Sequence, residues 1–166
     1  MTKKNRSSAP ETPATRMLRD HAVPFTAHFY EYQAHGGTRV PAQHLEVDEH
    51  RVIKTLIMEN ESGDPLIVLM HGDRTVSTKS LARRIGCKKV APCQPETANR
   101  HSGYLVGGTS PFGIRRKDVP VYVEKSILAL PTIFINGGRR GMLLQISPSA
   151  LLDLLQPETV ECGIEQ

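Results

Sequence analysis

The sequence contains no long apolar run and few cysteines. Its best candidate for a membrane segment, SILALPTIFI at residues 126–135, is short and interrupted by Pro131, whereas a spanning helix needs about 20 apolar residues. The polar amino terminus lacks the apolar core of a secretory signal. The three cysteines, Cys87, Cys93 and Cys162, are an odd number and do not predict a disulfide framework. We therefore expect a soluble, cytoplasmic protein.

Motifs for phosphate, dinucleotide and serine-nucleophile chemistry are also absent. Residues 103–117, GYLVGGTSPFGIRRK, hold a glycine pair but no Gly-Lys-Ser/Thr, and Pro111 stands where a phosphate-binding helix should begin. The same glycines do not form G-x-G-x-x-G, and no G-x-S-x-G turn occurs. The pair Gly107–Gly108 is either a tight turn that needs positive φ or a place where the backbone closely approaches something else.

The spacing of the histidines and cysteines does not predict a metal site. Cys87 and Cys93 are separated by five residues rather than two. Several histidines lack a second ligand at the spacing of zinc motifs, namely His28, His35, His44 and His50. No Ser-His-Asp or Cys-His arrangement follows from spacing either, so the sequence offers no evident protein nucleophile. We expect neither a metal nor another cofactor.

What the sequence does contain is a concentrated positive charge. The 166 residues carry a net charge of +4 and 39% hydrophobic residues, the size and composition of one globular domain. Between residues 79 and 140 lie 12 of the 21 Lys and Arg residues but only 3 of the 17 acidic residues. Such a block is either a solvated basic face or the contact surface for a polyanion such as RNA.

Hydrophobic periodicity predicts an α+β domain with more strands than helices. We expect a disordered tail at 1–11, the domain at 12–160 and a second tail at 161–166. Predicted helices start at Pro13 after a Thr12 cap, around 41–47, over 77–86 with Ser77 and Gly86 as caps, over 95–102, and over 147–155. Predicted strands cover 24–32, 51–60, 65–71, 88–92, 103–106, 120–126, 131–136 and 141–146, with 51–71 as a hairpin and a turn at 137–138. The sheet should be mixed, mostly antiparallel, partly closed and barrel-like, with helices flanking it.

Two predicted strands carry candidate site residues. On 51–60, Val52, Lys54 and Leu56 share one face, and both faces are apolar, so Lys54 lies on a central strand. It either extends its ammonium group to water or lines a pocket and binds an anion. On 24–32, a polar face with His28 and Tyr30 is opposite Phe25, Ala27 and Phe29, which we expect to enter the core.

Taken together, several fragments resemble the YbaK family, bacterial Cys-tRNA(Pro) deacylases related to the editing domain of prolyl-tRNA synthetases. They are FYEY after a TPAT helix start, VIKTL, GYLVGGTSPFG and INGGRRG, in this order and spread over residues 12 to about 155. The resemblance implies the fold of that editing domain. It also implies an enzyme that clears mischarged Cys-tRNA(Pro), with Cys-tRNA(Cys) as a possible further substrate.

The resemblance also assigns the site residues. It implies catalytic roles for Lys54, which would hold the substrate, and for the backbone N–H groups of Gly107 and Gly108, which would face the ester carbonyl. It places the substrate against Tyr30, Thr55, Ser110, Pro111, Asn136, Gly137 and Gly138. One departure is Leu143, which stands where some relatives carry Asp and others Ser, so this chain has no carboxylate there.

The implied mechanism is substrate-assisted: the cysteinyl thiol attacks its own ester carbonyl, and the enzyme orients it and stabilises the oxyanion. The implied partners are the 3′ end of mischarged tRNA and prolyl-tRNA synthetase, with no membrane and no DNA. From the basic block we expect tRNA contacts at Lys79, Arg83, Arg84, Arg115, Arg116 and Lys117. Two alternatives stay open: a hydrolase for Ala-tRNA(Pro) that uses activated water, and a non-catalytic module that binds tRNA or the synthetase.

Overall fold

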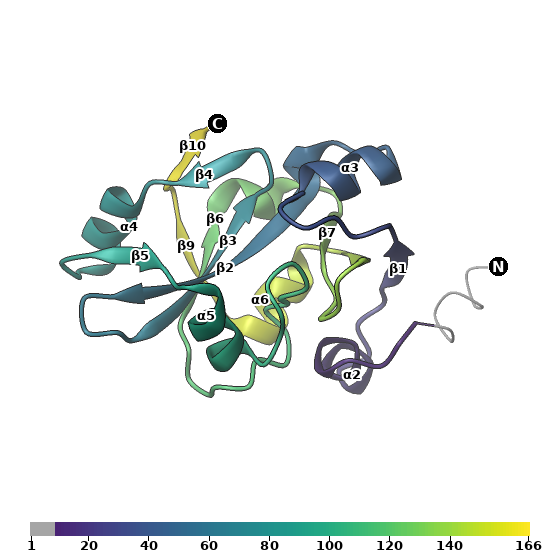
Figure 1. Cartoon of the computed structure of the whole chain (residues 1–166), viewed down its shortest axis with the longest axis horizontal. Helices are drawn as coiled ribbons and strands as arrows, with labels where there is room; N and C mark the ends of the chain where they lie inside the picture. The colour runs from purple at the N-terminus through teal and green to yellow at the C-terminus, as the bar shows by residue number, and fades with distance from the viewer. Residues whose placement is uncertain (1–8) are drawn as a thin grey trace.

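The computed structural model describes residues 9–166, and the sheet that runs through it organises the other elements (Figure 1). Most of the tail predicted at 1–11 lies outside the described residues, but Ala9 is buried against the core. None of the helices within 9–166 is long and apolar enough to cross a membrane.

Residues 9–166 contain five α-helices, and two of them begin at the capping residues that the sequence predicts. They are α2 (Pro13–Asp20), α3 (Arg39–Leu45), α4 (Thr78–Ile85), α5 (Pro95–Ser102) and α6 (Ser149–Leu155), with short 3-10 turns at Glu49–Arg51 and Lys125–Ala129. Thr12 closes a capping box on α2 and Ser77 accepts from the backbone of Ser80 on α4. Gly86 ends α4 with φ at 80°, a conformation that glycine adopts at little cost. Local sequence therefore determines the limits of these helices.

The strands form one mixed, open sheet and a small second one. Their bounds are β1 (Thr26–Phe29), β2 (Val52–Asn60), β3 (Pro65–His71), β4 (Arg74–Val76), β5 (Val90–Pro92), β6 (Val121–Glu124), β7 (Ile133–Asn136), β8 (Met142–Ile146), β9 (Glu158–Val160) and β10 (Gly163–Glu165). The main sheet has the order β1-β8-β7-β2-β3-β6-β9, with β5 added to β2, and β10 pairs with β4. The expected hairpin β2–β3 is confirmed. The pairs β2–β7, β3–β6 and β6–β9 are parallel.

The predicted partial closure of the sheet is wrong. Strands β1 and β9 lie at opposite ends of the strand order and do not pair with each other. Each face of the open sheet is instead covered by helices. Ile53, Ile57 and Ile135 pack with α2 and α6 on one face. On the other face Val52 and Phe134 pack with α3, while Met58 and Val68 pack with α4.

Three local predictions differ from the structure. The strand expected at 24–32 is only four residues long, and Phe29 is 47% exposed rather than in the core. Residues 103–106 are not a strand: Gly103 has positive φ, and the Tyr104 hydroxyl donates to the carbonyl of Phe112 across a compact loop. The last residues do not form a tail, because β10 pairs with β4. In each case a partner distant in sequence, or the lack of one, decides the conformation.

Candidate active site

Lys54 lies on β2, at the centre of the sheet. This strand pairs with β3 on one side and with β7 and β5 on the other. The side chain of Lys54 is half-buried, and its ammonium group donates a hydrogen bond to the backbone carbonyl of Arg74. Desolvation lowers the pKa of Lys54, while the carboxylates of Glu49 and Asp73 act in the opposite direction. Lys54 is thus a cation held in a partly desolvated, polar corner of the sheet.

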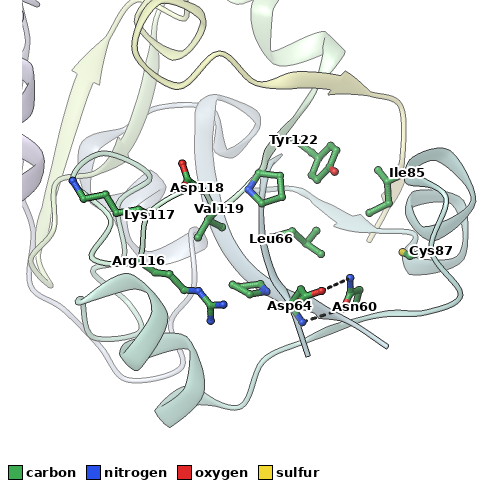
Figure 2. A pocket seen from close by; sticks show the side chains of 12 residues that line it. Asn60, Asp64, Leu66, Ile85, Cys87, Arg116, Lys117, Asp118, Val119 and Tyr122 are labelled. Atoms are coloured by element: carbon green, nitrogen blue, oxygen red, sulfur yellow. Dashed lines mark hydrogen bonds between the residues drawn. The ribbon is translucent and has the colours of Figure 1, made fainter. Parts of the chain in front are cut away.

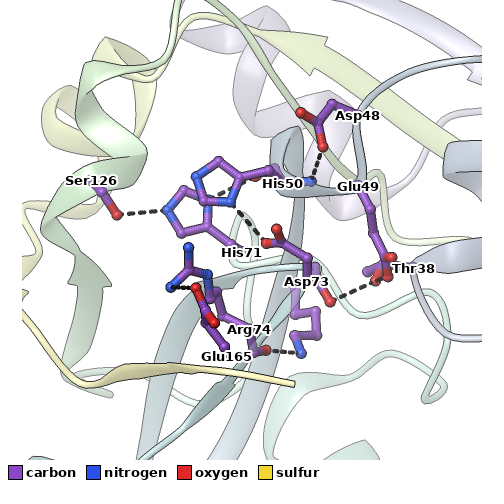
Figure 3. A network of polar contacts seen from close by, with 11 residues as sticks. Thr38, Asp48, Glu49, His50, His71, Asp73, Arg74, Ser126 and Glu165 are labelled. Carbon is purple, nitrogen blue, oxygen red and sulfur yellow. Dashed lines mark hydrogen bonds and ion pairs between the residues drawn. The ribbon is translucent and has the colours of Figure 1, made fainter.

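A network of polar side chains surrounds this corner (Figure 3). Thr38 donates to a carboxylate oxygen of Glu49 at 2.7 Å, and His50 lies 2.8 Å from a carboxylate oxygen of Asp73. The rings of His50 and His71 stack with centroids 3.6 Å apart. Sequence reasoning missed this network. The one feature of the local sequence that could have indicated it is His71, a buried polar residue at the end of the otherwise apolar strand β3.

The protonation of His71 follows from its two neighbours. Its Nδ1 lies 2.7 Å from the carbonyl oxygen of His50, and this oxygen can only accept, so Nδ1 donates. Its Nε2 then accepts from the Ser126 hydroxyl, also at 2.7 Å. Burial lowers the pKa of His71, which favours the same neutral form. His71 is therefore a neutral imidazole, held by His50 and Ser126.

Asn136 shares a face of the sheet with Lys54. Ile53 on β2 is opposite Ile135 on the parallel strand β7, so the next residues, Lys54 and Asn136, are neighbours on the same face. The side-chain oxygen of Asn136 is buried without a hydrogen-bond partner. On β8, Leu143 is opposite Asn136 and is almost completely buried. The position where some relatives carry a carboxylate is therefore an apolar wall here.

Thr55 lies on the other face of β2. Adjacent residues on a strand point to opposite sides, and Thr55 follows Lys54 directly. Its hydroxyl oxygen is buried and, like the amide oxygen of Asn136, has no hydrogen-bond partner. The site residues expected on β2 are thus divided between the two faces of the sheet.

The glycine pair approaches Tyr32 and the turn after β7. Gly107 has φ at 96°, and a Cβ placed there would lie 2.7 Å from the Tyr32 ring. A Cβ on Gly108 would lie 2.7 Å from the backbone nitrogen of Arg140. The Arg140 guanidinium donates to the carbonyl of Val106 at 2.9 Å and stacks over Tyr32. Both readings of the glycine pair hold, because the turn has positive φ and is also a close approach of backbone.

The glycine loop uses some of the groups that were expected to face the substrate. The backbone N–H of Gly108 donates to the carbonyl of Leu105 at 2.9 Å, so it is engaged within the loop. Ser110 is fully buried and its hydroxyl accepts from the backbone N–H of Phe112. Pro111 is buried as well. Ser110 therefore has a structural contact inside the loop.

The turn at 137–141 is held from three sides. The Thr12 hydroxyl donates to the carbonyl of Gly137 at 2.6 Å, and Gly138, with φ at 94°, lies against the Tyr104 ring. The backbone N–H of Tyr30 donates to the carbonyl of Gly141. Tyr30 packs beside the cluster of Val52, Phe134 and Leu143, and burial raises the pKa of its phenol. This places Tyr30 on the same face of the sheet as Lys54 and Asn136.

The predicted tRNA-binding residues form two exposed groups. Lys79, Arg83 and Arg84 are on α4, and Arg115, Arg116 and Lys117 are on the loop after residue 113. A hollow of about 450 Å³ lies between the end of α4 and this loop, with Ile85 and Cys87 on one side and Arg116 and Lys117 on the other (Figure 2). Of the predicted residues only Arg116 and Lys117 line this hollow, whereas the cations of α4 are on the helix whose last residue, Ile85, borders it. Arg84 is engaged with Glu158 at 3.3 Å.

This arrangement can be compared with known proteins. Residues 38–154 match the model of the family described as aminoacyl-tRNA editing domain. The chain belongs to this family. The match contains β2, the glycine loop and the turn after β7, and so it includes Lys54, Gly107, Gly108 and Asn136.

Relatives of the editing-domain family agree in sequence and in fold. The chain is 28% identical over 152 residues to EbsC of Enterococcus faecalis, a protein named as a Cys-tRNA(Pro)/Cys-tRNA(Cys) deacylase, covering 91% of this chain and 92% of EbsC. It is 30% identical over 130 residues to a proline–tRNA ligase of Moorella thermoacetica, covering 72% of this chain and 22% of the ligase. A crystal structure described as a trans-editing enzyme for prolyl-tRNA synthetase superposes with a TM-score of 0.79 at 20% identity, covering 94% of this chain and 99% of that one. The editing-domain fold expected from the sequence is confirmed.

Proposed function

We propose that the protein is a trans-editing deacylase that cleaves the aminoacyl ester of mischarged Cys-tRNA(Pro), and also that of Cys-tRNA(Cys). Membership of the editing-domain family and the near full-length similarity to EbsC support this substrate class. A prolyl-tRNA synthetase has difficulty in rejecting cysteine, because the two amino acids are similar in size, so a second site is needed to remove the error.

The observation that carries the proposal is the pair Lys54 and Asn136 on one face of the sheet. A buried amide oxygen without a partner is unfavourable, and a donor on the substrate, such as its α-ammonium group or a ribose hydroxyl, would satisfy it. The neighbouring Lys54 ammonium group would hold the ester, the ribose or the terminal phosphate. We propose that Tyr30 and the turn at 137–138 form the adjoining wall.

Oxyanion stabilisation would come from Lys54 and the N–H of Gly107. The N–H of Gly108 donates to Leu105, so we assign Gly108 to the shape of the loop. In the proposed step the cysteinyl sulfur bonds to its own carbonyl carbon, the ester C–O bond breaks, and the thiol proton goes to the ribose oxygen that leaves. The chain needs no nucleophile for this step, only orientation and charge stabilisation.

The tRNA would lie over the basic rim formed by α4 and the loop at 115–117. Exposed Lys and Arg side chains at the rim of a hollow match the phosphate backbone of the acceptor stem. We further propose that prolyl-tRNA synthetase presents the mischarged tRNA, and that the protein acts in the cytoplasm, where this substrate is made.

A second candidate reaction, hydrolysis of Ala-tRNA(Pro), would use the neutral His71. Its strand position, opposite Ile53, is on the face away from Lys54, and it is linked to Asp73 through His50. An imidazole that is already hydrogen-bonded to a hydroxyl is suited to accept a proton from water if it exchanges partners. Such a reaction would not depend on a thiol in the substrate.

The deciding experiment compares four labelled substrates at equal enzyme concentration. We expect rapid release of cysteine from Cys-tRNA(Pro), with Ser-tRNA(Pro) cleared much more slowly because the hydroxyl is a far weaker nucleophile at neutral pH. Pro-tRNA(Pro) should stay intact. Equal rates for the Ser and Cys esters would contradict the substrate-assisted step. Preference for Ala-tRNA(Pro) would favour activated water, and binding without cleavage would identify a non-catalytic module.

A further inference from the structure

A cluster of possible metal ligands lies on the side of β2 that faces away from Lys54. It consists of Glu59 on β2, Cys93 just after β5, and His101 in the last turn of α5. Glu59 is on the same face as Thr55 and Ile57, because residues two apart on a strand share a face. The cluster is therefore separate from the proposed deacylase site.

The distances in this cluster suit a single small cation. The Cys93 sulfur is 3.2 Å from Oε1 of Glu59, and Nε2 of His101 is 3.5 Å from the same oxygen. Zinc binds nitrogen and oxygen at about 2.1 Å and sulfur at about 2.3 Å, so tetrahedral ligands lie roughly 3.4–3.6 Å apart. All three donor atoms are within 4.8 Å of one another. A zinc ion would require only small shifts of the side chains.

The second observation is the state of His101. Its side chain is only 8% exposed, and Nε2 is buried without a hydrogen-bond partner while it points toward Glu59. A buried nitrogen whose neighbouring carboxylate oxygen lies 3.5 Å away, too far for a well-formed hydrogen bond, calls for an explanation such as an ion.

We propose that Glu59, Cys93 and His101 bind a divalent transition-metal ion, with Zn²⁺ as the best fit. One thiolate, one imidazole and one carboxylate form a mixed S, N, O set that suits zinc better than magnesium or calcium. Three protein ligands leave a fourth position for water or another small ligand. The ion would connect three parts of the chain: β2, the residue after β5, and α5. Strand β2 is distant in sequence from the other two.

A second group of potential ligands, His50, His71 and Asp73, does not fit a metal. The two imidazole rings stack 3.6 Å apart at 7° to one another, so their nitrogen lone pairs lie in two nearly parallel planes and do not converge on one ion. Both nitrogens of His71 already have partners. Both groups contain potential metal ligands, but only the ligands of the Glu59, Cys93 and His101 cluster are oriented to bind one ion.

Metal binding at the cluster must change two protonation states. Burial and the nearby Glu59 raise the pKa of the Cys93 thiol to about 12, so the metal-free cysteine keeps its proton. On binding, the S–H bond breaks, the metal–sulfur bond forms, and the proton goes to solvent, so the affinity should rise with pH. In the metal-free protein Nδ1 of His101 lies 3.3 Å from the Arg116 guanidinium, which can only donate. Nε2 then carries the hydrogen, and a metal on Nε2 requires the other tautomer and the release of Arg116.

The test is titration of the full-length, metal-free protein with Co²⁺ and Zn²⁺. We expect a sulfur-to-cobalt charge-transfer band that disappears in Cys93→Ser and persists in the matched control Cys87→Ser, whose cysteine packs in a different cluster. Zn²⁺ at a free concentration 100 times its Kd should raise Tm by roughly 5–10 °C. Loss of a ligand should weaken binding at least about tenfold. Circular dichroism checks that each variant is folded. If Cys93→Ser is not folded, the variant Glu59→Gln is used in its place.

The variant Arg116→Ala tests the predicted change of the His101 tautomer. We expect this variant to bind Zn²⁺ at least as tightly as the parent protein, because Nδ1 of His101 is then free to carry the hydrogen. Absence of the cobalt band in the parent protein, or unchanged affinity in folded Cys93→Ser and Glu59→Gln, would overturn the proposal.

Discussion

At the scale of single residues, the side chains of interest are polar groups held in partly desolvated positions. Lys54 is on a strand paired on both sides, and Asn136 and His101 each have a buried polar atom without a hydrogen-bond partner. Desolvation strengthens the interaction of such groups with a bound ligand and makes them costly without one. Function is therefore expected where these groups gather.

Replacement of Lys54 should separate activity from stability. Lys54→Ala is expected to lower kcat/KM for Cys-tRNA(Pro) by at least roughly tenfold, since one charged contact with the substrate is lost. Lys54→Arg should not restore it fully, because guanidinium is larger and planar. Tm should fall little or rise, as a partly desolvated charge is removed. Normal activity per folded molecule, with a strong loss of stability, would instead assign Lys54 a structural role.

His71 should make the protein sensitive to acid. Burial lowers its pKa below 6.5, so in the folded state it resists protonation that the unfolded chain accepts. The contribution to stability is complete above pH 6.5 and is lost as pH falls from 6.5 through the lowered folded pKa. Urea unfolding at a series of pH values should show this loss, and His71→Gln should flatten the curve in that window. An identical pH slope in the variant would show that His71 does not titrate as described.

At the scale of elements, the glycine loop and the turn at 137–141 determine the shape of the candidate site. They contact each other at Gly108 and Arg140, and Tyr104 of the loop packs against Gly138 of the turn. The turn also accepts hydrogen bonds from Thr12, the cap of α2, and from Tyr30, just after β1. Few of these contacts involve regular secondary structure. The loop conformation thus depends on close approach rather than on strand pairing.

Gly107→Ala should disturb this loop by contact as well as by backbone strain. The positive φ and the clash with Tyr32 together should lower the free energy of unfolding by roughly 1–3 kcal/mol and reduce deacylation. Gly37→Ala is the matched control, since Gly37 has φ at 60° but no atom within 4 Å of the added Cβ. Equal losses in the two variants would show that the approach of Tyr32 is unimportant. In the double variant Gly107→Ala/Tyr32→Ala, the part of the lost free energy of unfolding that is due to the clash should be recovered.

The carboxyl-terminal strand β10 should depend on Glu124. The buried carboxylate of this residue accepts from the backbone N–H groups of Cys162 and Gly163, at 2.8 and 2.9 Å. Glu124→Ala should cost about 2–3 kcal/mol and speed hydrogen exchange in β10, because two donors lose a charged acceptor. The exposed Glu161 is the control position. Unchanged exchange in β10 would contradict this role of Glu124.

At the scale of the whole molecule, charge is distributed unevenly around a hollow. Arg116 and Lys117 lie at its rim (Figure 2), and the other cations of the loop and those of α4 are exposed as well. Electrostatic attraction of this kind acts over several ångströms and weakens with salt. It would orient a tRNA without reading its sequence.

Binding of tRNA should weaken steeply as salt is raised. Replacing Lys79, Arg83 and Lys117 with Gln should reduce the salt dependence of tRNA binding. It should also weaken the binding of aminoacylated and non-aminoacylated tRNA alike. The control is Arg16→Gln, an exposed cation on α2 that is paired with Glu11. Binding that does not change with salt, or equal losses in the control, would contradict the assignment of the surface. The measurement should be made with and without prolyl-tRNA synthetase, since recruitment compensates for weak intrinsic affinity.

The sequence by itself determined the helices, the central hairpin and the family. Caps such as Ser77 and Gly86, and the two-residue alternation that places Lys54 on a covered strand, act through neighbours along the chain, so local pattern contains them. The tertiary structure alone decided the open sheet, the pairing of β10 with β4, the loop at 103–106 and the engaged N–H of Gly108. It alone also brought together Glu59, Cys93 and His101. These features join segments distant in sequence, and their geometry depends on how the whole chain packs, which spacing along the chain does not encode.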